Sequence, residues 1–415
     1  MDASGPSFDV AIVGGGLAGA SLAVALRELP LSVALIEAHA PDSAAQPSFD
    51  ERTTALGNAS RRMFEALGLW RRLSAEAAPI TSIHVSDAGR FGFARLEARE
   101  FGQEALGYVV PNRVLGRELW RALAAAPRIS AFMPARLDTL RVQDGLARLA
   151  IRQDGDAVTI GARLVVAADG AQSLVRKVAG LGVTVDDYGQ QAIVAALRTD
   201  QHGGGVAYER FTNAGPMALL PVRGPHGAAW HTLVWAAAPA DAQHLMQLPD
   251  AQFMREWQQA FGWRAGRALQ LGTRGRYPLA LTRSSGSVAP RIVLLGNAAQ
   301  SLHPVAGQGF NLALRDVATL AGMLARAGDA DIGATEWLAG FEADRGHDRD
   351  GVVGFTDTLV RVFGSRHPAV MAARDAGLLL FDLLPPARRA LSRVSLGFGR
   401  RAPRLARGLL PDAAP

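Results

Sequence analysis

The residues with the clearest chemical signal lie in a glycine-rich turn near the start of the chain. Gly14, Gly16 and Gly19 form a G-x-G-x-x-G motif between a β-rich run and an alanine-rich stretch typical of a helix. Gly14 permits a tight turn, Gly16 lets backbone N–H groups approach a pyrophosphate, and Gly19 allows the helix to pack closely on the strand. Glu37 ends the next apolar run, where a carboxylate accepts hydrogen bonds from an adenosine ribose. The motif predicts a dinucleotide-binding unit.

Two further polar loops follow apolar runs much later in the sequence. Asp169 and Gly170 come directly after one run, and Gly296 and Asn297 come after another. A strand, helix and strand in this order pair in parallel through a right-handed crossover, and open sheets of this kind bind ligands beyond the carboxyl ends of their strands. We therefore expect a doubly wound α/β sheet whose three loops meet at one edge.

The middle of the sequence has a different pattern of apolar residues. Short apolar or alternating runs separated by glycine and proline are typical of antiparallel sheet, and they cover 191–199, 206–211, 216–222 and 230–237. The region 80–101 has a similar pattern of strands and turns and is expected to contribute to the same sheet. After Gly309 the pattern becomes helical and is broken only at prolines.

These patterns predict a discontinuous arrangement of domains. The chain has 415 residues, of which 49% are hydrophobic, so it can bury more than one core and is not disordered. The expected parts are a nucleotide-binding domain from 1–79, 102–180 and 270–350, a sheet domain from 80–101 and 181–269, and a C-terminal helical region from 351–415.

Two longer stretches carry a family resemblance. Residues 164–176 read L-V-V-A-A-D-G-A-Q-S-L-V-R, and residues 291–316 read R-I-V-L-L-G-N-A-A-Q-S-L-H-P-V-A-G-Q-G-F-N-L-A-L-R-D. They closely resemble the Asp-Gly motif and the third flavin motif of the class A flavoprotein monooxygenases, which have the para-hydroxybenzoate hydroxylase-like fold. Within that family the second stretch looks most like the ubiquinone-biosynthesis hydroxylases, in the 2-polyprenyl-6-methoxyphenol hydroxylase branch. The likeness extends through 107–110, 215–221 and 234–235.

The resemblance implies a cofactor, a co-substrate and a reaction. The first domain would bind FAD, with NAD(P)H as the reductant, and the sheet domain would bind a polyprenylated methoxyphenol. Hydroxylation would proceed through a flavin C4a-hydroperoxide formed with O2. Gly307, Gln308 and Gly309 expose successive N–H groups where a helix begins, and this positive end suits the negative charge that a reduced flavin develops.

The resemblance also assigns individual residues to the flavin. Asn297 would touch the ribityl chain, where most of the family has Asp and the methoxyphenol-hydroxylase branch resembles this chain in having Asn. Pro304 would lie over the flavin face near C4a, and Asn311 would lie close to the pyrimidine ring. Asp169 matches a motif associated with both FAD pyrophosphate and NAD(P)H, although a strand-end carboxylate also caps helices.

Three more residues keep two interpretations. Arg52 and Arg113 match family positions that face the flavin phosphate or ring edge, but in a sequence with so many arginines a solvated surface role is equally consistent. His303 has the side chain of a base that could remove a phenol proton. We favour a packing or loop hydrogen-bonding role for it, because sister branches of the family do not all keep histidine at this position.

Several function classes lack the residues they need. The sequence has no cysteine, which excludes disulfides, thiolate metal sites and cysteine nucleophiles. Its histidines form no metal-binding pair with a carboxylate between them, and no G-x-S-x-G occurs, so neither a metal site nor a hydrolase is expected. Nucleic-acid binding is not expected either, because the basic region lacks interleaved aromatics. No apolar run is long enough to span a membrane and no secretory signal is visible, so we expect a cytoplasmic protein.

Positive charge is concentrated at the C-terminal end. From Arg361 onward ten arginines face three aspartates, a local net charge of +7 in a chain of +6, so the preceding residues carry −1. Leucines alternate with these arginines, which is typical of an amphipathic helix on the inner face of an anionic membrane or on an acidic partner of a quinone-synthesis complex. A helix packed on the body with a solvated basic face has the same composition.

Two alternatives to the main interpretation are kept open. The protein could be an FAD hydroxylase of a small soluble aromatic compound. It could also be a flavin-free accessory protein of a membrane-surface assembly for quinone synthesis.

Overall fold

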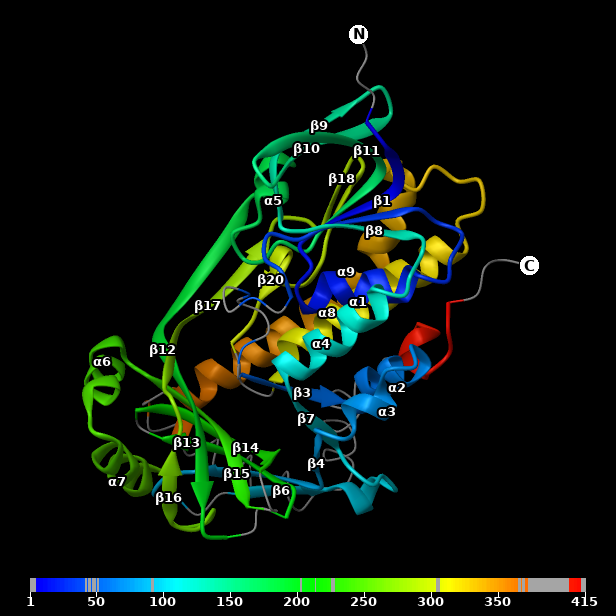
Figure 1. Cartoon of the computed structure of the whole chain (residues 1–415). Helices are drawn as coiled ribbons and strands as arrows, with labels where there is room; N and C mark the ends of the chain where they lie inside the picture. The colour runs from blue at the N-terminus through cyan, green and yellow to red at the C-terminus, as the bar shows by residue number, and fades with distance from the viewer. Residues whose placement is uncertain are drawn as a thin grey trace.

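The computed structural model gives the elements shown in Figure 1. The structure describes residues 5–41, 43, 46, 50, 52–90, 93–201, 204–212, 214–224, 228–303, 307–364, 367, 370–371 and 403–411. Within these residues the strands form three sheets, which we call the doubly wound sheet, the antiparallel sheet and the small sheet. This architecture confirms the expected α/β fold with a second, mostly antiparallel sheet.

The doubly wound sheet contains the strand, helix and strand that the glycine motif predicts. Helix α1 (Leu17–Leu26) connects its strands β1 (Ser7–Val13) and β2 (Val33–Ile36). The other strands on the path are β8 (Ile129–Phe132), β11 (Asp156–Ala167), β18 (Val288–Ala289) and β19 (Ile292–Leu294). β1 pairs in parallel with β2 on one side and with β11 on the other, and β11 pairs in parallel with β19. The carboxyl ends of β1, β11 and β19 therefore lie at the same edge.

The two faces of this sheet have different covers. The covering elements are α4 (Asn112–Leu123), α8 (Gln308–Ala325), β9 (Ala135–Gln143) and β10 (Leu146–Gln153). Val10 and Ile12 of β1 pack in one core with apolar residues of α1, α4 and α8. Ala11 and Val13 point the other way, into a core shared with β9 and β10, which pair with β11 as an antiparallel meander.

The antiparallel sheet joins segments that are far apart in the sequence. Its strands are β5 (Ser82–Asp87), β6 (Phe93–Glu97), β12 (Val183–Thr199), β13 (Val206–Thr212), β14 (Gly215–Arg223), β15 (Ala229–Ala237), β16 (Ala268–Leu271), β17 (Gly275–Ser284) and β20 (Gln300–Ser301). Among the described pairs, only β13 with β5 is parallel. Within the region 80–101, β5 and β6 thus lie in this sheet, whereas Ile80 pairs with Gly107 in another sheet and 98–101 form a short 3₁₀ helix.

One expected boundary differs from the observed pairing. β16 and β17 both pair with β12, so residues 268–284 lie in the antiparallel sheet and not with the nucleotide-binding domain expected from residue 270. The physical reason is the length of β12, which spans 183–199 and needs hydrogen-bonding partners along its whole edge. A local sequence pattern does not show this long-range pairing.

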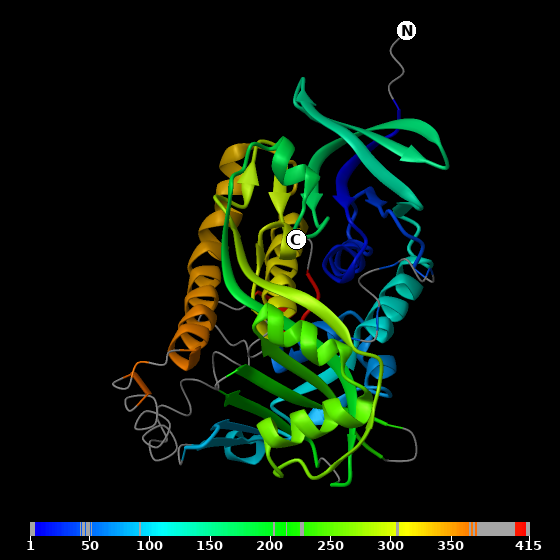
Figure 2. The ribbon, with the colours of Figure 1, turned by 90° about the vertical axis from the view of Figure 1, so that its left-hand side faces the viewer.

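Two described helices lie across one face of the antiparallel sheet. Figure 2 shows α6 (Pro239–Gln247) and α7 (Asp250–Phe261) lying across it. We call this the outer face, and its core includes Met217, Trp235 and Trp257. The opposite face, which we call the inner face, looks toward the small sheet and the doubly wound unit.

The small sheet lies between the two larger units, as Figure 1 shows. Its strands and the neighbouring helices are β3 (Thr53–Gly57), β4 (Ala78–Ile80), β7 (Gly107–Pro111), α2 (Asn58–Ala66), α3 (Trp70–Leu73) and η1 (Ala98–Phe101). Ile80 and Val109 of this sheet share a core with Ala207, Leu220 and Val222 from the inner face. The small sheet therefore fixes the inner face relative to the doubly wound unit.

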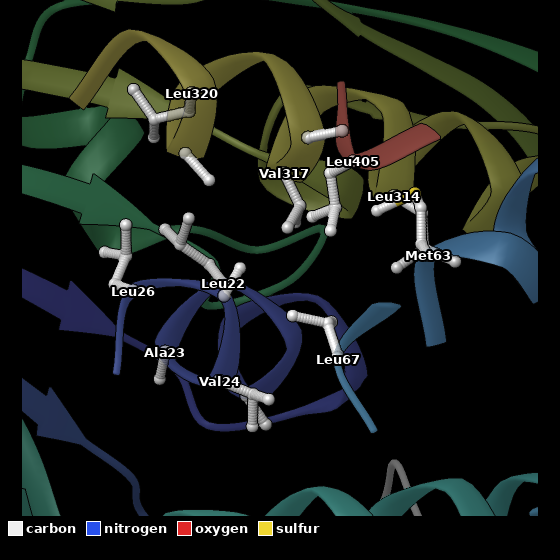
Figure 3. Packing of buried hydrophobic residues seen from close by; sticks show 14 of the residues in the cluster. Leu22, Ala23, Val24, Leu26, Met63, Leu67, Leu314, Val317, Leu320 and Leu405 are labelled. Carbon is white, nitrogen blue, oxygen red and sulfur yellow. The ribbon is translucent and has the colours of Figure 1, made fainter. Parts of the chain in front are cut away.

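The C-terminal part is helical as far as the structure describes it. α9 (Thr335–Gly364) follows α8, and a short turn, η5 (Leu405–Arg407), ends the described residues. Figure 3 shows Leu405 beside Val317 and Leu314 of α8, and it is 1% exposed. For this leucine, packing on the body is the correct alternative. Residues 372–402, which carry most of the basic region, lie outside the described residues. No described helix has the length and apolar character needed to cross a membrane.

Candidate active site

The first motif and the Asp-Gly loop are in direct contact. Gly14 has φ +101°, and a Cβ atom there would lie 2.4 Å from the carbonyl oxygen of Ala168 and 2.8 Å from the backbone nitrogen of Asp169. A Cβ atom on Gly19 would lie 1.9 Å from the carbonyl oxygen of Gly14. Only glycine fits at both positions, which leaves the backbone of the turn close to the start of α1.

The third strand end joins the same site. Gly296 has φ +55°, and its added Cβ would lie 3.3 Å from the Cβ of Ala18 in α1 and 3.4 Å from the Cβ of Ala313 in α8. Asn297 follows in an exposed position, at the turn η3 (Gly296–Ala298). The structure thus brings together the three loops that the sequence predicted to meet.

Glu37 is held beside the first motif. It is 6% exposed, and its Oε2 accepts a hydrogen bond from the backbone N–H of Gly15 at 2.5 Å. The carbonyl of Gly15 accepts from Trp120 Nε1 at 3.1 Å, and a Cβ on Gly15 would lie 2.6 Å from the Trp120 ring. Neither Gly15 nor Trp120 was predicted as a site residue, and the run of three glycines at 14–16 was the available signal for Gly15. A carboxylate has further lone pairs, so Glu37 can still accept a ribose hydroxyl.

Asp169 both caps a helix and presents a free oxygen. Its Oδ2 accepts from the N–H groups of Leu174 at 2.8 Å and Val175 at 3.3 Å, at the start of α5 (Leu174–Val178). Its Oδ1 is buried and has no hydrogen-bond partner among the described residues. Gly170, with φ +84°, has no atom within 4 Å of an added Cβ. A ligand donor beside Asp169 Oδ1 would satisfy a group that is otherwise costly to bury.

Arg176 ties the second loop to the third. It is 3% exposed and donates to the carbonyl of Ala298 at 2.8 Å and to the carbonyl of Ala171 at 2.7 Å. Ser173 Oγ accepts from the backbone N–H of Arg176 at 3.0 Å and so caps α5. These two residues of the Asp-Gly stretch hold loops together, which the sequence did not reveal.

Helix α8 begins within the third motif, with Gly307 as its N-cap residue. Gly307 takes a left-handed conformation, φ +59°, and its added Cβ would lie 3.2 Å from the Cβ of Ala55 in β3. At Gly309 an added Cβ would meet no atom within 4 Å, and Gln308 is 7% exposed. Pro304, expected over the flavin face, lies outside the described residues.

Asn311 fixes the start of α8 through four hydrogen bonds of its side-chain amide. Its Oδ1 accepts from Gly57 N at 2.8 Å and Ser60 Oγ at 2.7 Å, and its Nδ2 donates to the carbonyls of Ala55 and Gly307, both at 2.8 Å. All four hydrogen-bonding positions of the amide are filled. Asn311 lies in the first turn of α8, and its side chain joins α8 to β3 and α2. Its expected place close to the pyrimidine ring stays a prediction.

A buried ionic network braces α8 against α9. Arg315 Nη2 donates to Gln308 Oε1 at 3.4 Å, and its Nη1 pairs with Asp348 Oδ1 at 2.9 Å. Arg345 of α9 pairs with Asp316 of α8 at 2.7 Å, with both side chains less than 5% exposed. The network therefore reaches from α9 to Gln308, the first residue of α8.

The two candidate arginines lie near each other, with Arg52 directly before β3 and Arg113 in the first turn of α4. The backbone N–H of Asn112 donates to the carbonyl of Arg52 at 2.8 Å, which sets Arg113 one residue away. Arg52 pairs with Asp50 at 2.6 Å and lies 4.8 Å over the ring of Tyr277. Arg113 forms a half-exposed ion pair with Glu76 at 3.3 Å. Their expected contacts with the flavin remain predictions.

His303 is a buried residue of the third motif and lies between β20 and α8 in the sequence. It is 1% exposed, its ring meets the ring of Tyr188 edge-on at 5.3 Å, and burial lowers its pKa to about 4. Tyr188 Oη donates to Asp357 of α9 at 3.1 Å. An imidazole with this pKa is neutral at pH 7 and is a weak base. These observations favour the packing role over the proton-removing role.

The inner face of the antiparallel sheet carries small apolar side chains that are only partly covered. Ala218, Val234 and Val194 lie side by side across β14, β15 and β12, and all three are half-buried. Their neighbours that point to the outer face, such as Met217 and Trp235, are buried. Partly exposed apolar side chains deep between two units are what a site for an apolar ligand requires.

β3 connects this inner face to the loops. Thr53 Oγ1 donates to Thr232 Oγ1 of β15 at 3.0 Å, and Ala55, two residues later, contacts Gly307. The partly covered inner face and the N-terminus of α8 therefore border the same strand.

The site fits a flavin dinucleotide better than a metal. The loops offer backbone N–H groups, glycine approaches and an unsatisfied carboxylate oxygen, which are the groups that bind phosphates and hydroxyls. Within the described part of the chain, no three His, Asp or Glu side chains gather as metal donors.

Comparison with known proteins agrees with this arrangement. A family model described as an FAD binding domain matches residues 7–343. The chain is 38% identical to ubiquinone hydroxylase UbiL of Rhodospirillum rubrum, covering 97% of this chain and 93% of that protein. It is 31% identical to 3-demethoxyubiquinol 3-hydroxylase of Escherichia coli, covering 94% of this chain and 98% of that protein.

A solved structure supports the fold independently. The chain is similar to p-nitrophenol 4-monooxygenase PnpA from Pseudomonas putida, with a TM-score of 0.79, 17% identity, and coverage of 95% of this chain and 100% of that one. At this identity the likeness establishes the para-hydroxybenzoate hydroxylase-like fold. Together with the sequence relatives, it shows that the chain belongs to the family of FAD-dependent ubiquinone hydroxylases and is an FAD-dependent monooxygenase.

Proposed function

We propose that the protein hydroxylates the aromatic ring of a polyprenylated methoxyphenol during ubiquinone biosynthesis. Overall, one atom of O2 enters a ring C–H bond, the other leaves as water, and NAD(P)H is oxidised. The two sequence relatives are named a ubiquinone hydroxylase and a 3-demethoxyubiquinol 3-hydroxylase, which supports the pathway. The finer assignment to the methoxyphenol branch comes from the resemblance of the stretch with Asn297.

The observation that carries the proposal is the pairing of a dinucleotide site with a partly covered apolar surface. Gly14, Asp169 and Gly296 would hold FAD at the strand ends, and Gln308 and Gly309 would present N–H groups to its ring end. When bound and reduced by NAD(P)H, FAD supplies the electrons that activate O2. The chain's own residues bind and orient the two partners and keep the reacting atoms away from water.

The inner face suits the substrate because of the size of its side chains. Alanine and valine leave room for a ring and an isoprenoid chain, and burying such a chain is favourable by about 25 cal/mol per Å² of apolar surface. We therefore expect the ring to lie between the inner face and the N-terminus of α8.

The decisive experiment combines genetics with a purified assay. Deleting the gene should cause one quinone precursor to accumulate, and the purified FAD-loaded protein should convert that precursor with NAD(P)H and O2. A matched pair of phenols, with and without the prenyl chain, then tests substrate size. Equal conversion of both would favour a small aromatic substrate, and protein that neither contains nor takes up FAD would favour an accessory role.

Membrane association is a separate part of the proposal. The +7 charge of the region from Arg361 onward suits an anionic membrane surface. The isoprenoid chain of the proposed substrate would reside in that membrane. Flotation with vesicles of phosphatidylglycerol, compared with phosphatidylcholine at the same salt, tests this. Binding to neither vesicle would contradict it.

A further inference from the structure

One carboxyl group on the inner face has no task in the structure so far. Glu209 lies in β13, in register with Ala218 of β14 on one side and Val85 of β5 on the other. It is half-buried, and no hydrogen bond or ion pair joins it to the described residues. An unpaired carboxyl group is costly to bury in such an environment, which makes Glu209 a candidate for contact with a ligand.

The neighbours in β13 establish which way Glu209 points. Tyr208 and Arg210 face α7, because the Tyr208 ring packs edge-on against Phe261 and Arg210 donates to the carbonyl of Ala260. Side chains alternate along a strand, so Glu209 points to the opposite face. Phe211, which shares that face, stacks on Phe363 of α9 at 3.6 Å.

Glu209 therefore stands in the apolar row that the proposed substrate would touch. The row runs from Glu209 through Ala218 and Val234 to Val194, and Glu209 is the polar member among these four. A hydrophobic surface with one carboxyl group can orient an apolar ring by a single hydroxyl group.

Resting on the proposed function, we propose that Glu209 hydrogen-bonds the ring hydroxyl of the substrate and acts as the base that removes its proton. The phenol O–H bond breaks, the proton moves to a carboxylate oxygen of Glu209, and the electron pair stays on the ring oxygen. That pair makes the ring a better nucleophile toward oxygen. After hydroxylation the attacked carbon loses its hydrogen as a proton, and Glu209 returns its own proton to the ring oxygen.

The acidity of Glu209 suits this task. Burial raises its pKa from 4.5 to about 8, which brings it close to that of a phenol, near 10. A base works best when its pKa is close to the working pH, so Glu209 is stronger in this role than His303 with a pKa of about 4.

No charged neighbour accounts for this pKa. Three charged groups on neighbouring elements have other partners: Asp87 of β5 faces Arg90 at 3.8 Å, Arg223 of β14 donates to the carbonyl of Ala77 at 2.7 Å, and Arg361 of α9 pairs with Asp357 at 2.8 Å. Burial raises the pKa, and among the residues that the structure describes no fixed cation pairs with the carboxyl group and would compete with a substrate hydroxyl.

The main test compares Glu209→Gln with the wild type in the FAD-loaded enzyme. Glutamine keeps the shape and can still hydrogen-bond a hydroxyl, but it takes no proton. We expect kcat on a short-chain 2-polyprenyl-6-methoxyphenol to fall about 100-fold, with a less than threefold change in KM. Glu256→Gln, at an exposed position on α7, should behave as the wild type.

Two further readouts separate a base from a merely structural residue. In the wild type kcat should rise with pH through about 8, as Glu209 ionises, and Glu209→Gln should lack this rise. A ring-fluorinated phenol that is already ionised at pH 8 should restore most of the activity of Glu209→Gln. A loss of kcat that is the same for both phenols would overturn the proposal.

Thermal unfolding tests the buried acid without any turnover. The pKa of Glu209 is higher in the folded state than the ordinary 4.5, so its contribution to stability is fully present below about 4.5 and is lost as pH rises through about 8. Relative to Glu209→Gln, the wild type should therefore have a lower melting temperature at pH 9 than at pH 6. A difference that does not change with pH would contradict the placement of this carboxyl group.

The outcomes also distinguish this proposal from the one it rests on. A wild-type enzyme that hydroxylates the phenol, with Glu209→Gln equally active, overturns the role of Glu209 alone. A wild type that holds FAD but converts no phenol overturns the proposed function, and the role of Glu209 fails with it.

Discussion

The two faces of the antiparallel sheet are built from the same strands and differ in almost every property. The outer face has large side chains, including Trp235 and Trp257, buried under α6 and α7. The middle of the inner face has Ala218, Val234 and Val194, which are half-buried, with Glu209 beside Ala218. The contrast indicates that one face supplies stability and the other supplies space, which a strand achieves because alternate side chains point to opposite sides. Three substitutions test this division, in order of decreasing effect.

The largest effect is expected on the outer face. Trp257→Ala removes a fully buried ring that stacks on Phe261 at 4.9 Å, so it should destabilise the protein by about 3–5 kcal/mol. Denaturant unfolding measures this loss, and Trp263→Ala, at a position that is 68% exposed, is the matched control. If the two variants were equally stable, the outer face would not be the stabilising one.

An intermediate effect is expected on the inner face. Ala218→Phe fills space next to Glu209, so it should raise KM for the prenylated phenol at least 10-fold, equivalent to about 1.4 kcal/mol. FAD content and melting temperature should change little, because the side chain enters space that the sheet core does not use. Ala251→Phe, at an exposed position on α7, should leave KM unchanged. Unfolding of Ala218→Phe would show instead that the inner face is a packed core.

The smallest effect is expected where the inner face meets the small sheet. Thr232→Val removes the hydrogen bond between Thr53 Oγ1 and Thr232 Oγ1 and should cost about 1 kcal/mol of unfolding free energy. A double-mutant cycle with Thr53→Val isolates the coupling between the two hydroxyl groups. Additive effects of the two substitutions would mean that this contact does not join the sheets.

Local pattern was sufficient for much of the fold. The glycine motif predicted β1, α1 and β2, and alternation predicted β12 to β15, because outer-face positions such as Met217 and Leu219 must be apolar to be buried. The approach of Asp169 and Gly296 to the first motif followed from parallel pairing alone. The strands and the helix were read from short local segments, and the rule for parallel pairing then joined the distant loops.

What the sequence could not predict depends on distant partners. The pairing of β17 with β12 joins segments about 90 residues apart, and no local pattern encodes it. The meander of β9 and β10 was missed because many of its residues are exposed and charged, so it lacks a strong apolar run. Glu209 was missed because its orientation becomes informative only when the contacts of Tyr208 and Arg210 are known.

The alternation along β13 limits how this enzyme can change its substrate. Inserting or deleting one residue before Glu209 would bring Arg210 or Tyr208 to the inner side and turn the carboxyl group toward α7. New ring preferences must therefore arise by exchange of single side chains, while the length of this strand stays fixed. Library designs for altered specificity should vary residues at every second position and never shift the frame.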